Sequence, residues 1–239
     1  MSLSQRKESL IVFTKPALPG RAKTRLSKEI GVTKALELHK SLLKNISILA
    51  RKIYKKRRSV SLIAAWAVDS EELYRLPLSV WLPGPFLHTK QNGINLGDKM
   101  ISSSGKRLAQ GYNTILIGTD IPEINEQTIL DSIDSLLIKN TKEKRNKIVI
   151  GPSKDGGFYL IGMNTFNTFI FDGIDWNSES TLKKLIINLK IKNISYSLMK
   201  EKIDIDFLSD IKDIMKKYKK IECDLESDIK STIEKFDLI

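Results

Sequence analysis

Four cationic side chains close together form the first part of this sequence that could do chemistry. The stretch FTKPALPGRAKTRL (13–26) has no acidic residue and carries Lys15, Arg21, Lys23 and Arg25. Lysine and arginine make charge-assisted hydrogen bonds to phosphate oxygens, and a bound anion would offset the repulsion among the four cations. The stretch lacks the glycine pattern of a phosphate-binding backbone loop, so its side chains would have to hold the anion. A hydrated basic loop without a ligand is the alternative.

Asp120 is the first candidate for holding a metal ion. It follows an apolar run in LIGTDIPEI (116–124), and Ile121 and Pro122 restrict the chain directly after it. A carboxylate at the end of a buried strand is well placed to bind a hard cation such as Mg²⁺. Alternatively, Asp120 bonds only to loop amides and Pro122 serves as a turn residue.

An Asp-Gly-Gly sequence offers another carboxylate between two apolar runs. Asp155, Gly156 and Gly157 lie in GPSKDGGFYLIG (151–162). Adjacent glycines permit positive φ values or close approach of the backbone to a ligand, and Asp155 adds a carboxylate at the same place. Taken alone, the pattern is more typical of a tight hairpin between two strands.

Three aspartates gather in EKIDIDFLSDI (201–211), at Asp204, Asp206 and Asp210. The local sequence favours Asp206 as the N-cap of a following helix. The same carboxylate could be a second metal ligand if the fold returns this segment to the edge of the sheet.

The rarest residue types exclude several kinds of site. Cys223 is the only cysteine, and His39 and His88 are the only histidines. The chain therefore has no intramolecular disulfide, no thiolate metal cage and no multi-histidine zinc site. Neither histidine is given a role. The tryptophans are expected in the core rather than in a ligand site; they are Trp66, Trp81 and Trp176.

Apolar runs alternate with helical periodicity along the chain. Runs typical of strands lie at 9–14, 59–68, 113–120, 147–153, 157–163 and 193–201. Helical spacing is found at 33–52, 97–110, 125–139, 177–190 and once or twice in the last thirty or so residues, whereas SVWLPG and FLHTKQ (79–91) give weaker signals. This alternation predicts an α/β fold with a mainly parallel sheet covered on both faces. Ligands of such sheets bind beyond the carboxyl ends of the strands, where the motifs above lie.

The bulk composition is that of an ordinary globular chain. Its 239 residues are 41% hydrophobic and 28% charged, which predicts one domain over 1–239. The start MSLSQRKESLIVFT has no long apolar core and no later run could span a bilayer, so a cytoplasmic location is expected. The net charge of +12 favours anionic partners. A nucleic-acid-binding protein is one alternative, although the sequence shows no motif that reads nucleic acid.

Six stretches in this order resemble a known family, the bacterial glycosyltransferases of the nucleotide-diphospho-sugar transferase superfamily that are associated with arsenosugar-biosynthesis or radical-SAM genes. They are FTKPALPGRAKTRL, QNGINLGDKM, LIGTDIPEI, GPSKDGGFYLIG, IDWNSESTL and DIDFLSDI. The first also resembles 2-phospho-lactate guanylyltransferases, and the last resembles a motif of molybdenum cofactor guanylyltransferases. The chain departs from the family at Asn95, where an aspartate is usual, and at FLS after Asp206, where Thr-Pro-Glu is usual.

The resemblance implies a three-layer α/β/α, GT-A-like fold, a nucleotide-bound donor and a divalent metal, Mg²⁺ or Mn²⁺. By position, it implies that donor phosphates are held by Lys15, Arg21, Lys23 and Arg25. It places the metal on Asp120 and Asp206. It also implies that the donor sugar or acceptor side is lined by Asp155, Gly156 and Gly157.

The resemblance leaves two reactions open. In the leading hypothesis, a sugar moves from a nucleotide-diphosphate sugar to a small acceptor. A metal ion on Asp120 and the loop cations would neutralise the charge of the leaving group, and Asp155 would be the general base. In the alternative, an acceptor phosphate attacks a nucleoside triphosphate and releases pyrophosphate. Both require the loop cations and Asp120 to meet at one pocket.

Overall fold

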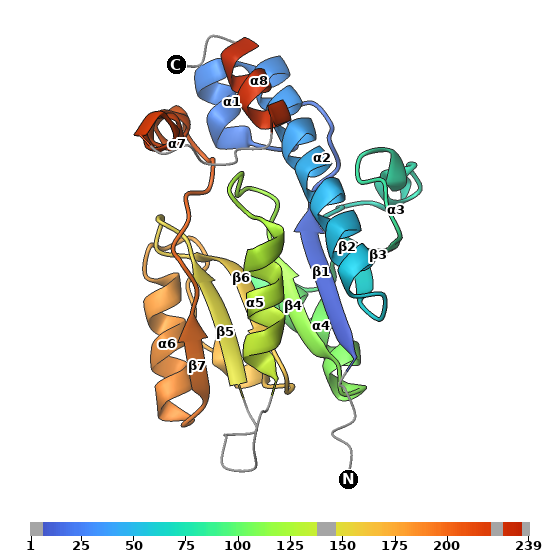
Figure 1. The fold of residues 1–239 in the computed structure, drawn as a ribbon, viewed down its shortest axis with the longest axis vertical. Helices are drawn as coiled ribbons and strands as arrows, with labels where there is room; N and C mark the ends of the chain where they lie inside the picture. Colours follow the sequence, from blue (N-terminus) through green and yellow to red (C-terminus); the bar gives the residue numbers. More distant parts are fainter. Residues whose placement is uncertain (1–6, 138–146, 221–226, 236–239) are drawn as a thin grey trace.

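A seven-stranded sheet forms the centre of the protein (Figure 1). The structure is a computed structural model that describes residues 7–137, 147–220 and 227–235; Cys223 lies outside these residues. The order of the strands across the sheet is β3-β2-β1-β4-β6-β5-β7. In chain order, the strands are β1 (Glu8–Thr14), β2 (Ser61–Trp66), β3 (Phe86–Lys90), β4 (Asn113–Ile117), β5 (Lys147–Pro152), β6 (Phe158–Met163) and β7 (Ser195–Leu198).

The sheet is mainly parallel, as the sequence predicted, with one reversed strand. β1 pairs in parallel with β2 and β4, β2 with β3, and β5 with β7. Only β6 runs the other way among the described strands, because a tight turn joins it to β5 as an antiparallel hairpin. The hairpin interpretation of the Asp-Gly-Gly sequence is thereby confirmed. The carboxyl ends of β1 to β5 consequently meet at one edge of the sheet.

Helices cover both faces of the sheet because each has an apolar stripe that must be buried. On one face, α2 (Val32–Lys56) and α5 (Glu126–Leu136) pack through residues such as Leu43 and Ile133. On the other, α4 (Leu96–Ala109) and α6 (Thr181–Ile191) pack through Met100 and Leu185. The predicted three-layer α/β/α arrangement is confirmed.

A third apolar cluster lies beyond the carboxyl ends of the strands. It joins the first half of α2 to α1 (Thr24–Ile30), α7 (Leu208–Lys220) and α8 (Ser227–Lys235). Figure 1 shows these helices gathered at one end of the molecule, above the sheet edge. Leu26 of α1, Leu42 of α2 and Ile211 of α7 are fully buried there. The segment 15–23 between β1 and α1, called the basic loop below, thus lies between the sheet and this helical cluster.

The stretch 69–95 differs most from the expected structure. It contains α3 (Glu71–Tyr74), a single 3-10 turn η1 (Leu78–Val80) and the strand β3, which the sequence did not predict. β3 is an edge strand that pairs with β2 alone, and its Leu87 is 56% exposed. An edge strand needs no continuous apolar run, so its pattern is weak. A second 3-10 turn, η2 (Thr168–Phe171), precedes α6.

Helix boundaries follow their capping residues where the sequence supplies them. Asn125 caps α5, as predicted, by accepting a hydrogen bond from the Thr128 amide. α6 begins at Thr181 instead of 177, so residues 177–180 form a loop. Within the described residues, no helix has the length and apolar character needed to cross a membrane.

Candidate functional site

Three adjoining cavities form a groove along the edge where the parallel strands end. A basic cavity is lined by Lys15, Arg21, Lys90 and Lys99, with Asp69. A central cavity is lined by Lys15, Lys23, Arg25, Asp120 and Asp206. An acidic cavity of about 570 Å³ is lined by Asp120, Asp155, Glu179 and Asp204, with Arg25 as its one cation. Lys15 lines the first two cavities, whereas Arg25 and Asp120 line the last two.

The central cavity brings the basic loop together with Asp120. Lys23 Nζ lies 2.5 Å from Asp120 Oδ1 and donates a hydrogen bond of 2.5 Å to the Ile205 carbonyl. Asp206 Oδ1 is 3.9 Å from the same nitrogen. The Lys23 side chain is only 2% exposed. Its ammonium is therefore used to hold three parts of the chain together and is not exposed to a ligand.

The other three cations of the stretch 13–26 lie in different cavities. Arg25 is 58% exposed and pairs with Asp206 at 2.9 Å, while its guanidinium lies over the Phe207 ring. Lys15 is exposed where the basic and central cavities join. Arg21 lies in the basic cavity alone and forms an exposed ion pair of 2.8 Å with Asp69. Lys15, in the loop, and Arg25, in the first turn of α1, are thus the cations of 13–26 that are open to the central cavity.

Asp120 carries a negative charge in this setting. Burial alone would raise the pKa of its carboxyl group, but the Lys23 ammonium beside it holds the pKa below the usual value. The side chain is 48% exposed on the cavity side. The ionised carboxylate can therefore be solvated by the cavity or meet a bound cation.

Two carboxylates of the central cavity are available to a hard cation. Asp120 and Asp206 both contact Lys23, so they lie on the same side of this cavity. Within the described parts of the chain, no group of three or more histidine, cysteine, aspartate or glutamate side chains could hold a metal. Mg²⁺ and Mn²⁺ accept one or two carboxylates when substrate phosphates and water complete their coordination. The residues present fit a metal of that kind and do not form a complete protein cage.

Backbone hydrogen bonds return the segment 199–206 to the groove. The Lys202 amide donates to the Pro152 carbonyl (3.1 Å), and the Ile205 amide donates to the Asp120 carbonyl (3.0 Å). Asp204 and Asp206 therefore flank the end of β4. The expectation that Asp206 is an N-cap is wrong, because its carboxylate contacts Arg25 while Asp210 Oδ2 accepts from the Asp206 and Phe207 amides.

The turn between β5 and β6 places Asp155 at the acidic cavity. Asp155 Oδ1 accepts hydrogen bonds from the Gly157 amide (2.9 Å) and from the Ser153 hydroxyl. Gly156 adopts a φ of +86°, and a Cβ built on it would lie 2.0 Å from the Glu179 carbonyl oxygen. Gly157 lines the cavity, whereas Gly156 lets the loop that carries Glu179 approach the turn.

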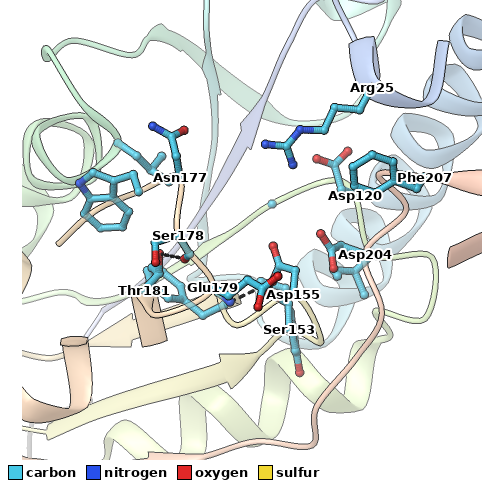
Figure 2. A pocket seen from close by; sticks show the side chains of 17 residues that line it. Arg25, Asp120, Ser153, Asp155, Asn177, Ser178, Glu179, Thr181, Asp204 and Phe207 are labelled. Atoms are coloured by element: carbon cyan, nitrogen blue, oxygen red, sulfur yellow. Dashed lines mark hydrogen bonds between the residues drawn. The ribbon is translucent and has the colours of Figure 1, made fainter. Parts of the chain in front are cut away.

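Asp204 is a carboxylate to which the sequence gave no role. Burial raises its pKa to about 6, with further contributions from the nearby carboxylates of Asp155 and Asp206. Figure 2 shows Asp204 beside Asp155, with Asp120 close by, and all three line the acidic cavity. The only signal in the sequence was the alternation IDID, which does not tell which carboxylate faces the sheet.

Two aromatic side chains of the groove were also missed. Trp176, expected in the core, lines both the central and the acidic cavity. His39 lines the central cavity; it is 3% exposed, its Nε2 is 3.0 Å from the Lys15 carbonyl, and burial lowers its pKa. A polar residue at a core position of α2 was the available signal for His39. For Trp176, nothing local distinguished a cavity wall from the core.

Asn95, where the sequence departs from the family it resembles, has a structural task. It forms a capping box with Asp98 at the start of α4. Its neighbours Gln91 and Leu96 line the groove, and Gln91 donates to the Ala65 carbonyl at 2.9 Å. The loop before α4 therefore forms part of the groove wall.

This fold is the GT-A-like fold of nucleotide-diphospho-sugar transferases. It superposes with a TM-score of 0.83 on the crystal structure of a candidate nucleotide-diphospho-sugar transferase from Desulfovibrio desulfuricans G20, with 23% identity over 98% of this chain and 96% of that one. A cytidylyltransferase from Leptospira borgpetersenii serovar Hardjo-bovis (strain JB197) gives a TM-score of 0.52, with 11% identity over 98% of this chain and 94% of that one. At these identities, the similarities show a shared fold.

The sequence itself identifies the family. The chain belongs to the family described as uncharacterized protein conserved in bacteria (DUF2064), whose sequence profile matches residues 49–178, more than half of the chain. The matched part includes Asp120 and the Asp155 turn but not the basic loop. No curated protein matches the sequence significantly.

Proposed function

We propose that the protein is a metal-dependent glycosyltransferase that moves a sugar from a nucleotide-diphosphate donor to a small acceptor, as in the arsenosugar- and radical-SAM-associated enzymes it resembles. One observation carries this proposal. Lys15, Arg25 and the ionised Asp120 line one cavity at the carboxyl ends of β1 and β4. Open α/β sheets bind their ligands at this edge. The fold shared with nucleotide-diphospho-sugar transferases supports the same conclusion.

In this mechanism, Lys15 and Arg25 bind the oxygens of the donor diphosphate. Asp120 and Asp206 would hold Mg²⁺ or Mn²⁺, which supplies Lewis-acid stabilisation of the leaving diphosphate. Lys23 orients Asp120 and keeps it ionised, so its role is positioning instead of the predicted contact with phosphate. Arg21 lines the adjoining basic cavity and would contact the more distant part of the nucleotide.

The acceptor hydroxyl requires a proton acceptor beside the anomeric carbon. We assign this role to Asp155, whose turn hydrogen bonds engage Oδ1 and leave Oδ2 to the cavity. The acceptor oxygen forms a bond to the anomeric carbon, the bond from that carbon to the diphosphate oxygen breaks, and the hydroxyl proton passes to Asp155. The nucleoside diphosphate leaves with the bonding electron pair.

The alternative reaction is nucleotidyl transfer, in which an acceptor phosphate attacks the α-phosphorus and pyrophosphate leaves. The fold shared with the Leptospira cytidylyltransferase supports this reaction as the alternative. The same cations and the same metal would serve it. The two reactions differ in the acceptor and in the product released, so they can be separated by experiment.

A product assay tests the proposal. The protein is incubated with Mg²⁺ and a panel of nucleotide sugars and nucleoside triphosphates, and the released nucleoside diphosphate and pyrophosphate are measured. Slow release of nucleoside diphosphate from one nucleotide sugar is expected. Release of pyrophosphate from a triphosphate would instead support nucleotidyl transfer, and the absence of both products would contradict a transferase.

Two variants connect the assay to the cavity. Lys15→Ala and Arg25→Ala should each weaken nucleotide binding roughly 10- to 100-fold, because each removes a charge-assisted hydrogen bond. Lys106→Ala, an exposed change on α4 outside the groove, is the matched control and should bind normally. Unchanged nucleotide binding in both cavity variants would contradict the assigned site.

A further inference from the structure

Charge is divided sharply along the groove. The basic cavity is lined by four cations and one carboxylate, Asp69. The acidic cavity is lined by four carboxylates and one cation, Arg25, which already pairs with Asp206 at 2.9 Å. Figure 2 shows the acidic side chains converging from the turn after β5, the loop before α6 and the segment before α7. The two ends of one groove are thus built for ligands of opposite charge.

Three backbone amides near this negative charge already have hydrogen-bond partners within the protein. The start of α6 lies at the acidic cavity, and free amides there would attract an anion. The first two amides of α6 are already used: Thr181 donates to the Ser178 carbonyl (3.2 Å) and Leu182 to the Gly156 carbonyl (2.9 Å). The Gly157 amide is used by Asp155 (2.9 Å). A phosphate in this cavity would therefore meet four carboxylates, and these three amides would not be free to bind it.

The walls of the acidic cavity suit a hydroxylated organic cation. Trp176 lines it and packs against the rings of Phe158 (edge-on, 6.3 Å between ring centroids) and Phe171 (tilted, 5.7 Å). Phe207 is 44% exposed, and the Arg25 guanidinium lies over its ring, 5.8 Å from the ring centroid. Aromatic faces bind ammonium groups and the carbon faces of sugars. The Asn177 amide group also lines the cavity and can bind ligand hydroxyls, whereas the Ser153 and Thr181 hydroxyls already donate to groups of the protein.

We propose that the acidic cavity binds the acceptor, and that this acceptor carries hydroxyl groups and a protonated amine and has no phosphate. The proposal rests on the function proposed above, in which the donor diphosphate occupies the central cavity. It names the chemical class of the second substrate. Glu179 and Asp204 bind the amine, and Asp155 lies beside the reacting hydroxyl. An acceptor phosphate, which nucleotidyl transfer requires, is disfavoured by the same carboxylates.

Matched ligands test the charge preference directly. For each of three hexoses, the neutral sugar, its amino derivative and its phosphate are offered to the full chain with Mg²⁺ and a nucleoside diphosphate, and binding is measured by saturation-transfer NMR. Where a hexose binds, its amino derivative should bind at least roughly 10-fold more tightly than the neutral sugar, and its phosphate should bind most weakly of the three. Stronger binding of the phosphate, equal binding within every triple, or no binding by any sugar would overturn the proposal.

Two variants test whether Glu179 and Asp204 cause the preference for the amino sugar. Glu179→Gln and Asp204→Asn keep size and shape and remove one negative charge each, so each should reduce the advantage of the amino sugar several-fold. Asp131→Asn on α5, an exposed position outside the groove, should leave it unchanged. A preference that survives both cavity changes would also overturn the proposal. Nucleoside diphosphate binding is recorded in the same samples, so a failure of the proposed function, with no nucleotide bound, is distinguishable from a failure of this inference alone.

Discussion

Lys23 is unusual for a lysine in both its backbone and its surroundings. Its φ of 52° and ψ of 42° place it in the left-handed region, where a residue with a side chain loses about 1 kcal/mol. Its ammonium has Asp120, Asp206 and the Ile205 carbonyl as partners. These contacts offset the backbone strain. Strain that persists because its surroundings fix it is common at functional sites.

Replacing Lys23 tests this positioning role. Lys23→Met keeps the apolar stem but leaves the Asp120 carboxylate and the Ile205 carbonyl without their donor, so the free energy of unfolding should fall by about 2 kcal/mol. Water can still reach the half-exposed Asp120, which limits the loss. Urea unfolding measures it. The control is Lys40→Met, which breaks the exposed pair with Glu37 and should cost less than about 0.5 kcal/mol; equal losses would contradict the role.

The sequence predicted only part of the residue-level site. It predicted that Lys15, Arg25 and Asp120 lie near one another, and they line one cavity because parallel strands bring their carboxyl ends to one edge. It did not distinguish exposed from buried cations. Lys23 is buried because it contacts Ile205, which lies 182 positions away in the chain. The residues around Lys23 in the sequence give no sign of so distant a partner.

At the level of elements, the β5–β6 turn and the loop before α6 form one unit. Gly156 is the point of contact, since a Cβ there would overlap the Glu179 carbonyl. The Leu182 amide also donates to the Gly156 carbonyl at 2.9 Å. The position of Glu179 in the acidic cavity therefore depends on a glycine in the neighbouring turn.

Gly156→Ala should be strongly destabilising. The change adds a clash with the Glu179 backbone to the cost of a positive φ, so a loss of about 3 kcal/mol in unfolding free energy is expected. Gly111→Ala is the matched control, because Gly111 has a φ of +79° and nothing within 4 Å of a built Cβ. That change should cost only about 1 kcal/mol. If urea unfolding gave the same loss for both variants, the close packing of Gly156 would not be the reason.

Periodicity predicted most elements of the fold. The buried strands β1, β2, β4, β5 and β6 were found because their apolar runs are continuous, and α2 because its stripe is long. The edge strand β3 was missed for the opposite reason, since half-exposed residues such as Leu87 break the pattern. The overlong prediction for α6 arose because residues 177–180 have the composition of a helix start but turn toward the groove.

For the whole molecule, the division of charge along the groove was not predictable. The net charge of +12 suggested anionic partners, which suits the basic and central cavities. The acidic cavity combines Asp155, Glu179 and Asp204, which come from separate segments. Only the fold brings them together. The total charge of a chain therefore says little about the charge of its individual ligand sites.

The central claim is that a diphosphate binds between the basic loop and Asp120. A crystal structure of the protein with a nucleoside diphosphate and Mg²⁺ tests it most directly. The account predicts phosphate oxygens within hydrogen-bonding distance of Lys15 and Arg25, and the metal on Asp120. A diphosphate bound in the acidic cavity or outside the groove, with Lys15 and Arg25 free of it, would contradict the claim.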